Sequence, residues 1–187
     1  MTITATRPES SVEAVNNGHE ILSYAVSNST LGRVLVASSA KRVAAILIGD
    51  DTPSLVEELR DSFPRAMLRA TDDDRFIGRV VELIEDPSSP VDLPLDIRGT
   101  SFQQKVWAAL RAIPAGVTET YSDLATRVGD PNAVRAVAGA CAANKLAVAI
   151  PCHRVLRTDG SLSGYRWGVE RKRALIEREA APARMSA

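Results

Sequence analysis

Short apolar stretches separated by polar turn residues dominate residues 21–49. The stretches are rich in β-branched and aliphatic side chains, and Ser, Thr, Gly or Lys-Arg residues separate them, which is typical of short strands. The sequence therefore predicts a small antiparallel sheet made of three segments, ILSYAVS (21–27), GRVLVAS (32–38) and RVAAILIG (42–49).

A helical period follows the predicted strands. Apolar residues recur every three or four positions over residues 50–63 and again over 72–86, which predicts two helices with one buried face each. RAMLRA (65–70), between them, predicts a further strand. Residues 86–99, DPSSPVDLPLDIRG, contain three prolines and cannot continue a helix, so they predict a linker after an α/β first half.

The second half has a mostly helical pattern. A capping box, formed by Thr100 with Gln103 or by Ser101 with Gln104, predicts the start of a helix over 100–114. Two shorter helices, separated by an Asp-Pro turn, have the outline of a helix-turn-helix. The segments predicted after the first helix are helices in 116–130 and 132–144, an apolar strand at 145–150, a glycine-bearing loop at 160–168 and a helix at 169–180 with Val169, Ala174, Leu175 and Ile176 in the core.

Charge is distributed unequally, although the net charge of the chain is zero. Residues 1–97 carry nine Lys and Arg against sixteen Asp and Glu, whereas residues 98–187 carry fourteen against seven. A positive second half favours a polyanionic partner such as nucleic acid, and a chance distribution of surface charge is the alternative.

The N-terminal segment is polar and lacks the apolar centre of a secretory signal. It predicts a disordered tail over residues 1–19. No apolar run approaches the roughly 18 residues that span a bilayer. We therefore expect a cytoplasmic protein (associated with the nucleoid, if bacterial) that does not contact a membrane.

One cysteine lies in an unusual setting, in AVAIPCHRVLR (147–157). Cys152 follows an apolar run, and His153 and Arg154 follow it directly. Neighbouring His or Arg lowers a thiol pKa, and a histidine can take the thiol proton, so the pattern favours a nucleophile. The alternative is a buried structural cysteine, which is our interpretation of Cys141, among alanines. The two cysteines lack the spacing of a zinc site, so we expect no metal.

Four segments together resemble the O6-alkylguanine-DNA alkyltransferase family. The first carries the active-site signature of that family, two more match motifs upstream of it, and the last is similar to the C-terminal domain of bacterial Ada. The segments are IPCHRV (150–155), RAVAGACAAN (135–144), TYSDLA (120–125) and LSGYRWGVERK (162–172).

The resemblance implies a ribonuclease-H-like α/β domain over residues 20–97, with its linker at 86–97, and a winged helix-turn-helix domain over 98–182. It implies irreversible, stoichiometric transfer of the alkyl group from O6-methylguanine, and from O4-methylthymine, to Cys152. The partner is double-stranded DNA, bound through the minor groove without sequence specificity. No cofactor is implied, because the DNA is the alkyl donor. We expect a monomer in solution, and cooperative clustering on DNA stays open.

The family also implies roles for the residues around Cys152. His153 is the base, working through a water molecule, and Glu179 orients it. The backbone carbonyls of Cys152 and Val155 contact the guanine amino group. Asn144 braces the turn before the active-site segment, while Tyr165, with Lys172 near it, forms a wall of the pocket. From the residues alone, we would interpret Glu179 as an exposed charged residue on a helix, and Asn144 as a residue that ends a helix.

Further roles concern the approach to DNA. Arg135 enters the minor groove and fills the space left by the flipped base, and Tyr121 rotates the target nucleotide. Small residues such as Ala136 and Ala140 let the helix approach the groove closely. Without the family, Arg135 would be interpreted as an ordinary helix cation and Tyr121 as a core or capping-turn tyrosine.

Some positions depart from the family pattern. Lys145 follows Asn144 where many members have proline, Ala138 replaces a common glycine, and Arg166 and Trp167 enlarge the pocket loop. The range of alkyl groups is therefore open. Two other functions compete: a non-catalytic winged-helix lesion sensor that uses Cys152 as a switch, and a cysteine hydrolase. The hydrolase lacks a matching distant His/Asn pair.

Overall fold

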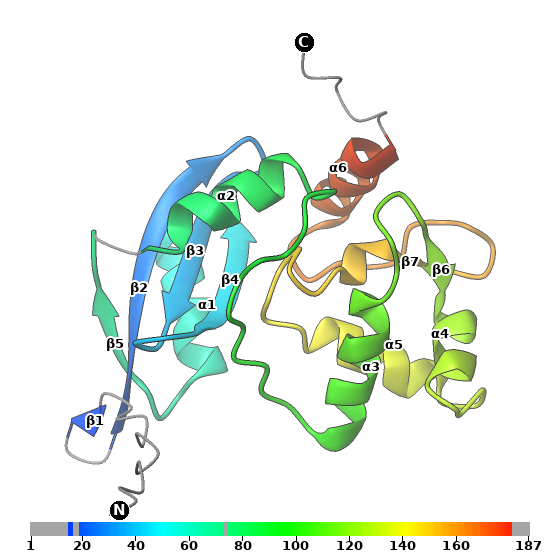
Figure 1. Cartoon of the computed structure of the whole chain (residues 1–187), viewed down its shortest axis with the longest axis horizontal. Coiled ribbons are helices and arrows are strands. Elements are labelled where there is room, and N and C mark those ends of the chain that lie inside the picture. Colours follow the sequence, from blue (N-terminus) through cyan, green and yellow to red (C-terminus); the bar gives the residue numbers. More distant parts are fainter. Residues whose placement is uncertain (1–14, 17–18, 73–74, 181–187) are drawn as a thin grey trace, which may run out of the picture.

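The computed structural model of the chain describes residues 15–16, 19–72 and 75–180. A sheet with two helices forms the first half, and the second half is mostly helical (Figure 1). Within the described residues, no helix is long and apolar enough to cross a membrane.

Three strands form an antiparallel meander, as predicted: β2 (His19–Ser29), β3 (Gly32–Ser38) and β4 (Val43–Gly49). The turn between β2 and β3 needs Gly32, whose φ of 111° favours glycine. A two-residue strand, β1 (Val15–Asn16), pairs with His19 and Glu20. The predicted disordered tail over 1–19 is therefore wrong for Val15, Asn16 and His19, and the rest of it lies outside the described residues.

The complete sheet is mixed, because a strand outside the predicted antiparallel sheet joins it in the parallel sense. The predicted strand at 65–70 forms as β5 (Met67–Ala70), but it pairs parallel with β2. Helix α1 (Thr52–Ser62) connects β4 to β5, and such a crossover brings a strand back in the parallel sense. The resulting order of the four longer strands is β4-β3-β2-β5.

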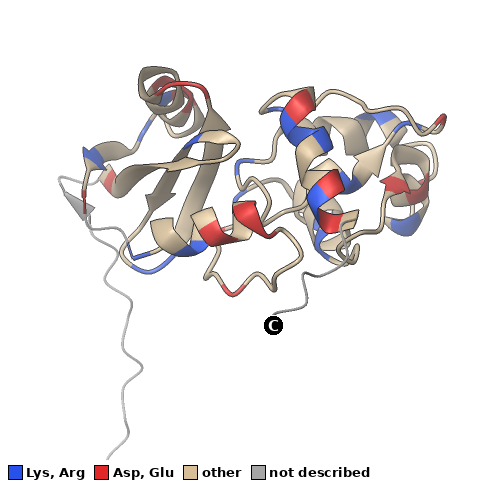
Figure 2. Cartoon of the chain, turned by 90° about the horizontal axis from the view of Figure 1, so that it is seen from above, with Lys and Arg blue, Asp and Glu red and all other residues tan. Residues whose placement is uncertain are grey.

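Two helices cover opposite faces of this sheet (Figures 1 and 2). Asp51 caps α1 by accepting a hydrogen bond from the Ser54 backbone, and Leu55 and Leu59 are buried beneath it. Helix α2 (Ile77–Glu85) begins several residues later than the predicted range of 72–86, and it buries Val80, Leu83 and Ile84. The core of the first half thus lies on both sides of the strands.

Four helices build the second half. Thr100, with Gln103, makes the capping box, which decides between the two predicted alternatives. The Trp107 indole donates to the Ala140 carbonyl at 2.8 Å, and this hydrogen bond joins the helix that contains Trp107 to the helix that contains Ala140. The helices are α3 (Ser101–Arg111), α4 (Tyr121–Arg127), α5 (Val134–Ala142) and α6 (Val169–Ala180).

Helix α6 buries an unexpected face. Of the four predicted core residues only Leu175 is buried; Val169 is exposed, and Ala174 and Ile176 are half-buried. The buried positions beside Leu175 are the charged Lys172 and Glu179. Hydrophobicity alone could not identify this face of the helix, because its two buried charged side chains are held by polar groups of the candidate active site.

The strand predicted at 145–150 is wrong. The segment is a series of buried turns, in which the Ile150 amide donates to the Leu146 carbonyl at 2.9 Å and Val148 has a φ of 64°. A 3₁₀ helix, η1 (Cys152–Arg154), follows it. The chain then enters β7 (Val155–Leu156), which pairs parallel with β6 (Glu119–Thr120).

The edge of β4 joins the two halves. The linker pairs with it through the Val43 amide and the Pro94 carbonyl at 2.8 Å. The turn segment before Cys152 pairs with the same edge, since the Ile46 amide donates to the Lys145 carbonyl at 2.8 Å and the Ala147 amide to the Ile46 carbonyl at 3.0 Å. The first half therefore supports the backbone that leads to the candidate nucleophile.

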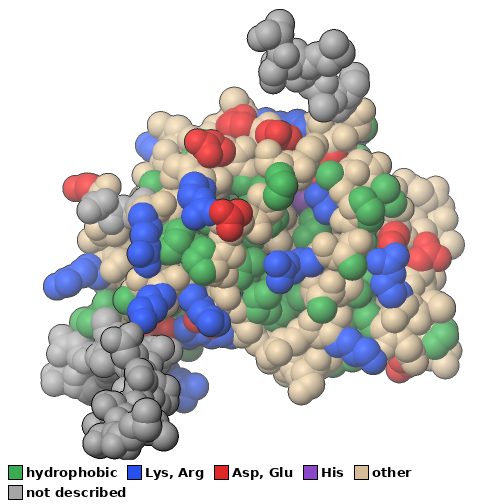
Figure 3. Space-filling view, viewed as in Figure 1, with side chains coloured by type: hydrophobic (Ala, Val, Ile, Leu, Met, Phe, Trp, Pro, Cys, Tyr) green, Lys and Arg blue, Asp and Glu red, His purple; other side chains and the backbone are tan. Residues whose placement is uncertain are grey.

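Net charge alone does not mark a nucleic-acid face. In Figure 2, where the ribbon is coloured by residue type, acidic and basic positions alternate along the helices. On the face seen in Figure 3, Lys and Arg side chains lie over both halves. Any interface must therefore be located from particular residues.

Candidate active site

Asn144 organises the segment that ends at Cys152. Its side chain is fully buried. The Asn144 amide group donates to the Ile150 carbonyl at 2.9 Å and to the Cys152 Sγ at 3.2 Å, and its oxygen accepts from the Leu146 amide at 2.9 Å. One side chain thus satisfies backbone groups that a strand would have paired with a neighbour, and it explains why 145–150 turns instead.

The Cys152 thiol is 4% exposed, and burial raises its pKa above the ordinary value. The hydrogen bond from Asn144 and the charges of Lys172 and Arg166 oppose this effect only in part. The neighbouring Arg154, expected to lower this pKa, points its charge elsewhere. At rest the sulfur therefore carries a proton that a base must remove before the sulfur can attack.

A buried group of three side chains supplies such a base. His153 Nε2 lies 2.8 Å from Glu179 Oε1, and both side chains are almost completely buried. The Arg154 guanidinium donates to both carboxylate oxygens of Glu179 and also to the Ile113 carbonyl at 2.5 Å. Burial favours a neutral Glu179, but the hydrogen bonds from His153 and Arg154 prevail and lower its pKa to about 2.

The ionised Glu179 sets the tautomer of His153. A carboxylate only accepts hydrogen bonds, so Nε2 must carry the proton and Nδ1 must be the basic nitrogen. Burial lowers the pKa of His153, which keeps the ring neutral, and Nδ1 has no hydrogen-bond partner within the described part of the chain. The ring is therefore a neutral base with its lone pair available.

Cys152 opens on a pocket of about 540 Å³. Its wall is made by α5, by the start of α4 and by the loop before α6. Cys141 also lines it, but burial raises the pKa of that thiol to about 12, in keeping with a packing role. The other principal lining residues are Tyr121, Ala138, Arg157, Tyr165 and Arg166.

A hydrogen-bonded chain crosses one wall of this pocket. Tyr121 Oη lies 2.7 Å from Ser163 Oγ, and the Lys172 ammonium donates to the same oxygen at 2.7 Å and to the Val155 carbonyl at 2.5 Å. Burial lowers the pKa of Lys172 and raises that of Tyr121. Tyr121, Val155 and Lys172, which the resemblance gave separate roles, are therefore connected through Ser163, a residue that the sequence did not single out.

Tyr165 forms a wall of the pocket, as expected. Its ring meets Trp167 edge to face, with centroids 5.2 Å apart. Trp167 is itself buried and packs behind Tyr165 instead of lining the pocket. Among the described residues the Tyr165 hydroxyl is buried without a hydrogen-bond partner. Of the two large residues that the sequence placed in the pocket loop, Arg166 therefore lines the pocket and Trp167 does not.

Helix α5 presents only part of its predicted surface. Arg135 and Ala136 are exposed at its start, where they are free to meet a ligand. Ala140 is 2% exposed and faces α3, so the prediction that its side chain contacts DNA is wrong. It lies three residues after the buried Val137, and residues at this spacing share one face of a helix, here the inner one.

Sequence reasoning missed two functional positions. Arg154 looked like a general source of positive charge, but it is the main partner of Glu179. Ser163 looked like a loop residue, and it joins Tyr121 to Lys172. Neither residue could be identified from the sequence, because their contacts join segments that are far apart along the chain. No periodic pattern of neighbouring residues marks either position.

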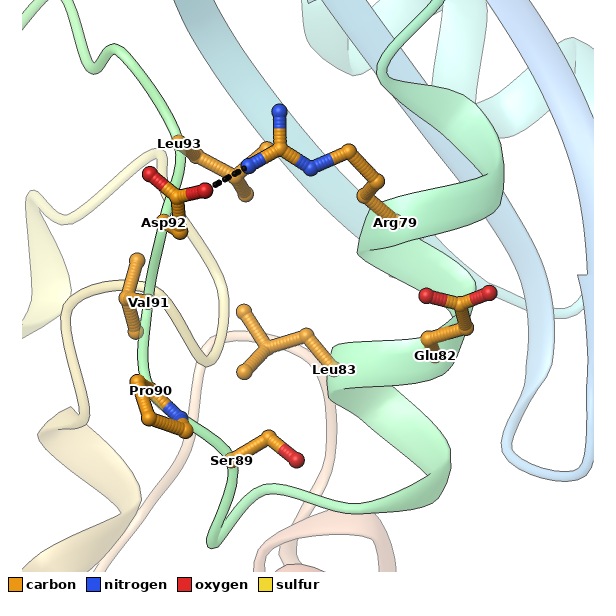
Figure 4. A pocket seen from close by; sticks show the side chains of 8 residues that line it. All are labelled: Arg79, Glu82, Leu83, Ser89, Pro90, Val91, Asp92 and Leu93. Atoms are coloured by element: carbon orange, nitrogen blue, oxygen red, sulfur yellow. Dashed lines mark ion pairs between the residues drawn. The ribbon is translucent and has the colours of Figure 1, made fainter.

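A second hollow, between α2 and the linker, lacks the residues that make the first one reactive. Figure 4 shows this hollow of about 190 Å³, with Arg79 and Asp92 paired at 2.9 Å beside Leu83, Pro90 and Val91. It contains neither a thiol nor an imidazole. Across the described ranges, no group of three or more His, Cys, Asp and Glu side chains could hold a metal ion.

Comparison with protein families matches residues 101–181 to the family described as 6-O-methylguanine DNA methyltransferase, DNA binding domain. The Escherichia coli K12 protein named bifunctional transcriptional activator/DNA repair enzyme Ada is 54% identical over 159 residues, which are 84% of this chain and 45% of that protein. The chain thus spans about half the length of this relative.

A relative of more similar length is the inducible methylated-DNA–protein-cysteine methyltransferase of Bacillus subtilis 168. It is 37% identical over 159 residues, which are 83% of each chain. Among solved structures, that of Mycobacterium tuberculosis OGT in complex with DNA matches with a TM-score of 0.72 and 33% identity, over 85% of this chain and 93% of that one.

Proposed function

Because the chain belongs to the family of the methylated-DNA–protein-cysteine methyltransferases, we propose that it repairs alkylated DNA by direct reversal. Cys152 accepts the alkyl group of O6-methylguanine, and of O4-methylthymine, and each molecule reacts once. The observation that carries this proposal is a buried Cys152 thiol opening on a pocket, followed directly by a neutral His153 held by Glu179.

The proposed chemistry is a displacement at the alkyl carbon. His153 Nδ1 takes the thiol proton through a water molecule, and the thiolate attacks the carbon attached to O6. A sulfur–carbon bond forms while the carbon–oxygen bond breaks, and the electron pair left on guanine is neutralised by a proton. Glu179 stabilises the imidazolium that forms. Tyr121, which lines the pocket and is linked through Ser163 to the Lys172 ammonium, supplies the proton. No cofactor is required, since DNA donates the alkyl group.

We assign the fold in finer terms as well. Residues 20–97 form a ribonuclease-H-like domain with its linker at 86–97, and residues 98–182 form a winged helix-turn-helix domain. The short helices α4 and α5, with a tight turn between them, support the second assignment. Exposed Arg135 and Ala136 at the start of α5 support docking in the minor groove of double-stranded DNA, by a monomer and without sequence specificity.

The intact mass of the protein tests this function. After incubation with a duplex that carries one O6-methylguanine, we expect the protein to gain about 14 Da on the peptide with Cys152, and the DNA to regain guanine. The gain should stop at one methyl group per chain. A protein that binds the duplex but gains no mass is a lesion sensor, and repeated turnover would indicate a hydrolytic enzyme.

Arg135 is expected to serve nucleotide flipping and not the chemical step. Arg135→Ala should slow transfer from duplex DNA by about ten- to a hundredfold, because extruding a nucleotide costs a few kcal/mol that the inserted side chain offsets. Reaction with the free base O6-benzylguanine should change less than about twofold. Single-turnover rates on both substrates measure this.

Arg173→Ala, which removes an exposed arginine from α6, is the matched control for lost positive charge. An equal loss on duplex and free base in Arg135→Ala would show that Arg135 supports the pocket itself. An equal effect of both substitutions on the duplex would show a general effect of charge.

A further inference from the structure

Helix α6 contacts the first half of the molecule through two arginines, Arg171 and Arg178. They are seven residues apart and therefore lie on one side of the helix, two turns from each other. Their side chains are 18% and 23% exposed, so each is largely shielded from water and held by its partners. The two residues attach the helix near both of its ends.

Both arginines bind the turn between β2 and β3. Arg171 donates through Nε to the Leu31 carbonyl at 2.7 Å, and its terminal nitrogen pairs with Asp50, directly after β4. Arg178 donates to the Thr30 hydroxyl at 2.5 Å. This turn lies at the upper end of the sheet in Figure 1, beside α6. The end of the sheet is thus a fixed point to which the helix is attached twice.

Arg178 also contacts the end of α2. It donates at 2.5 Å to the Ile84 carbonyl, one of those that a helix leaves unpaired at its C-terminal end, and pairs with Glu85 at 3.4 Å. The Glu85 carboxylate accepts hydrogen bonds from the Thr30 amide and hydroxyl. Burial alone would raise the pKa of Glu85, but these bonds and the Arg178 charge lower it. Arg178, Thr30 and Glu85 therefore form one connected group.

The residue that follows each arginine belongs to the active site. Lys172, after Arg171, takes part in the hydrogen-bonded chain of the pocket wall. Glu179, after Arg178, is the partner of His153. Consecutive residues point about 100° apart around a helix, so one side of α6 is fixed to the first half while the adjoining side serves the site. A rotation or a sliding of α6 would move both site residues together.

From these contacts we infer that Arg171 and Arg178 are positioning residues, which fix α6 against the first half so that Lys172 and Glu179 lie where the reaction needs them. The inference rests on the proposed transfer to Cys152. In the described part of the chain, neither arginine is among the residues that line the pocket. Their effect is therefore indirect, and a displacement of about 1 Å at a reacting group can slow a reaction by about a hundredfold.

Nuclear magnetic resonance of the His153 ring tests the placement of Glu179 without any reaction. The chain has two histidines, and His19 is exposed whereas His153 is fully buried. The Nε2 proton that His153 shares with Glu179 should therefore give one slowly exchanging signal at low field. In Arg178→Met, which keeps the apolar stem of the side chain but not the guanidinium, this signal should shift or broaden.

Two further variants accompany this measurement. Arg178→Lys can still donate to the Ile84 carbonyl and face Glu85, so it should restore part of the wild-type signal. Arg173→Met, at an exposed position of the same helix, is the matched control and should leave the signal unchanged. Thermal unfolding shows which variants are folded, and Arg178→Lys provides the test if Arg178→Met is not.

Single-turnover rates measure the consequence for transfer. Arg178→Met should slow the reaction by about tenfold on duplex O6-methylguanine and on free O6-benzylguanine alike, because the base is misplaced and flipping is not affected. Arg171→Met should slow it by a smaller factor of about three, since its partner Asp50 is 89% exposed. Thr30→Val should slow the wild type and add little in Arg178→Met, because both substitutions break the same contact.

The outcomes separate this inference from the proposed function. A folded Arg178→Met protein with the wild-type signal overturns the inference, whether or not its rate falls, because Glu179 is then in place. A loss confined to duplex DNA, or an equal loss in Arg173→Met, overturns it as well. A wild-type protein that transfers nothing overturns the proposed function, while the His153 signal still decides whether Arg178 positions Glu179.

Discussion

A variant with Cys152→Ser is expected to transfer no detectable methyl group from O6-methylguanine while still binding the damaged duplex. Serine has nearly the shape of cysteine and can still accept the hydrogen bond from Asn144, so the turn segment should persist. Its hydroxyl is far less acidic than a thiol and is a weak nucleophile at carbon. We expect the single-turnover rate to fall at least about a thousandfold.

Cys141→Ser is the control, because Cys141 lines the same pocket with a thiol whose pKa burial raises to about 12. In this variant the peptide with Cys152 should still gain one methyl group. The rate is followed by quenched-flow mass spectrometry, and binding by fluorescence anisotropy of a labelled duplex. Methylation of Cys141 in the Cys152→Ser protein would mean that the pocket, and not the His153 pair, selects the acceptor.

Glu179→Gln is expected to give the second largest effect. The amide keeps the shape of the side chain but cannot stabilise an imidazolium, so the transfer rate should fall by about 10² to 10⁴. Arg154 would also lose its anionic partner in a buried setting, with the Ile113 and Pro87 carbonyls as its remaining acceptors. The free energy of unfolding should therefore fall by about 3 kcal/mol.

Urea unfolding and single-turnover kinetics measure these two quantities. Glu177→Gln, an exposed neighbour on α6, should change neither. A Glu179→Gln protein that is destabilised but transfers methyl groups at the wild-type rate would make Glu179 purely structural.

The same residue gives the stability of the protein a defined dependence on pH. The pKa of Glu179 is about 2 in the folded chain against an ordinary value of 4.5, so its contribution is complete above pH 4.5 and disappears as the pH falls toward 2. That contribution amounts to about 3 kcal/mol. His153 acts in the same sense, because its lowered pKa favours the folded state above pH 6.5 and less so below. Unfolding free energies in Glu179→Gln should consequently vary less between pH 5 and pH 3.

Sequence patterns identified most elements of the fold where one local signal dominates. The capping box at Thr100 and the strands of residues 21–49 are examples, since neighbouring residues alone determine them. The prediction of a strand at residues 145–150 failed because an apolar pattern indicates that a segment is buried but does not determine its backbone conformation. Their turns depend on one side chain, Asn144, whose hydrogen bonds reach Cys152. The parallel pairing of β5 could not be predicted from local residues either, because pairing with β2 is set by the path of α1 across the sheet.

The candidate site was predictable to different degrees. A motif contains Cys152 and His153, whereas only the family resemblance implied Glu179; the structure brings His153 and Glu179 within 2.8 Å. Periodicity could not have found Glu179, because it lies on a buried face of α6 that carries two charges. Arg154 and Ser163 were missed because their roles depend on partners from other segments of the chain.

The covered edge of β4 has a consequence for how the chain can be divided. Every residue from Val43 to Ile48 is buried, and this strand is completed by Pro94 and Asp96 on one stretch and by Lys145 and Ala147 on another. A fragment that stops before the linker would expose a flat, apolar row of unpaired amides and carbonyls. Such an edge recruits strands from other molecules, so the fragment would be prone to aggregate. The second half thus protects the sheet on which it rests from such association.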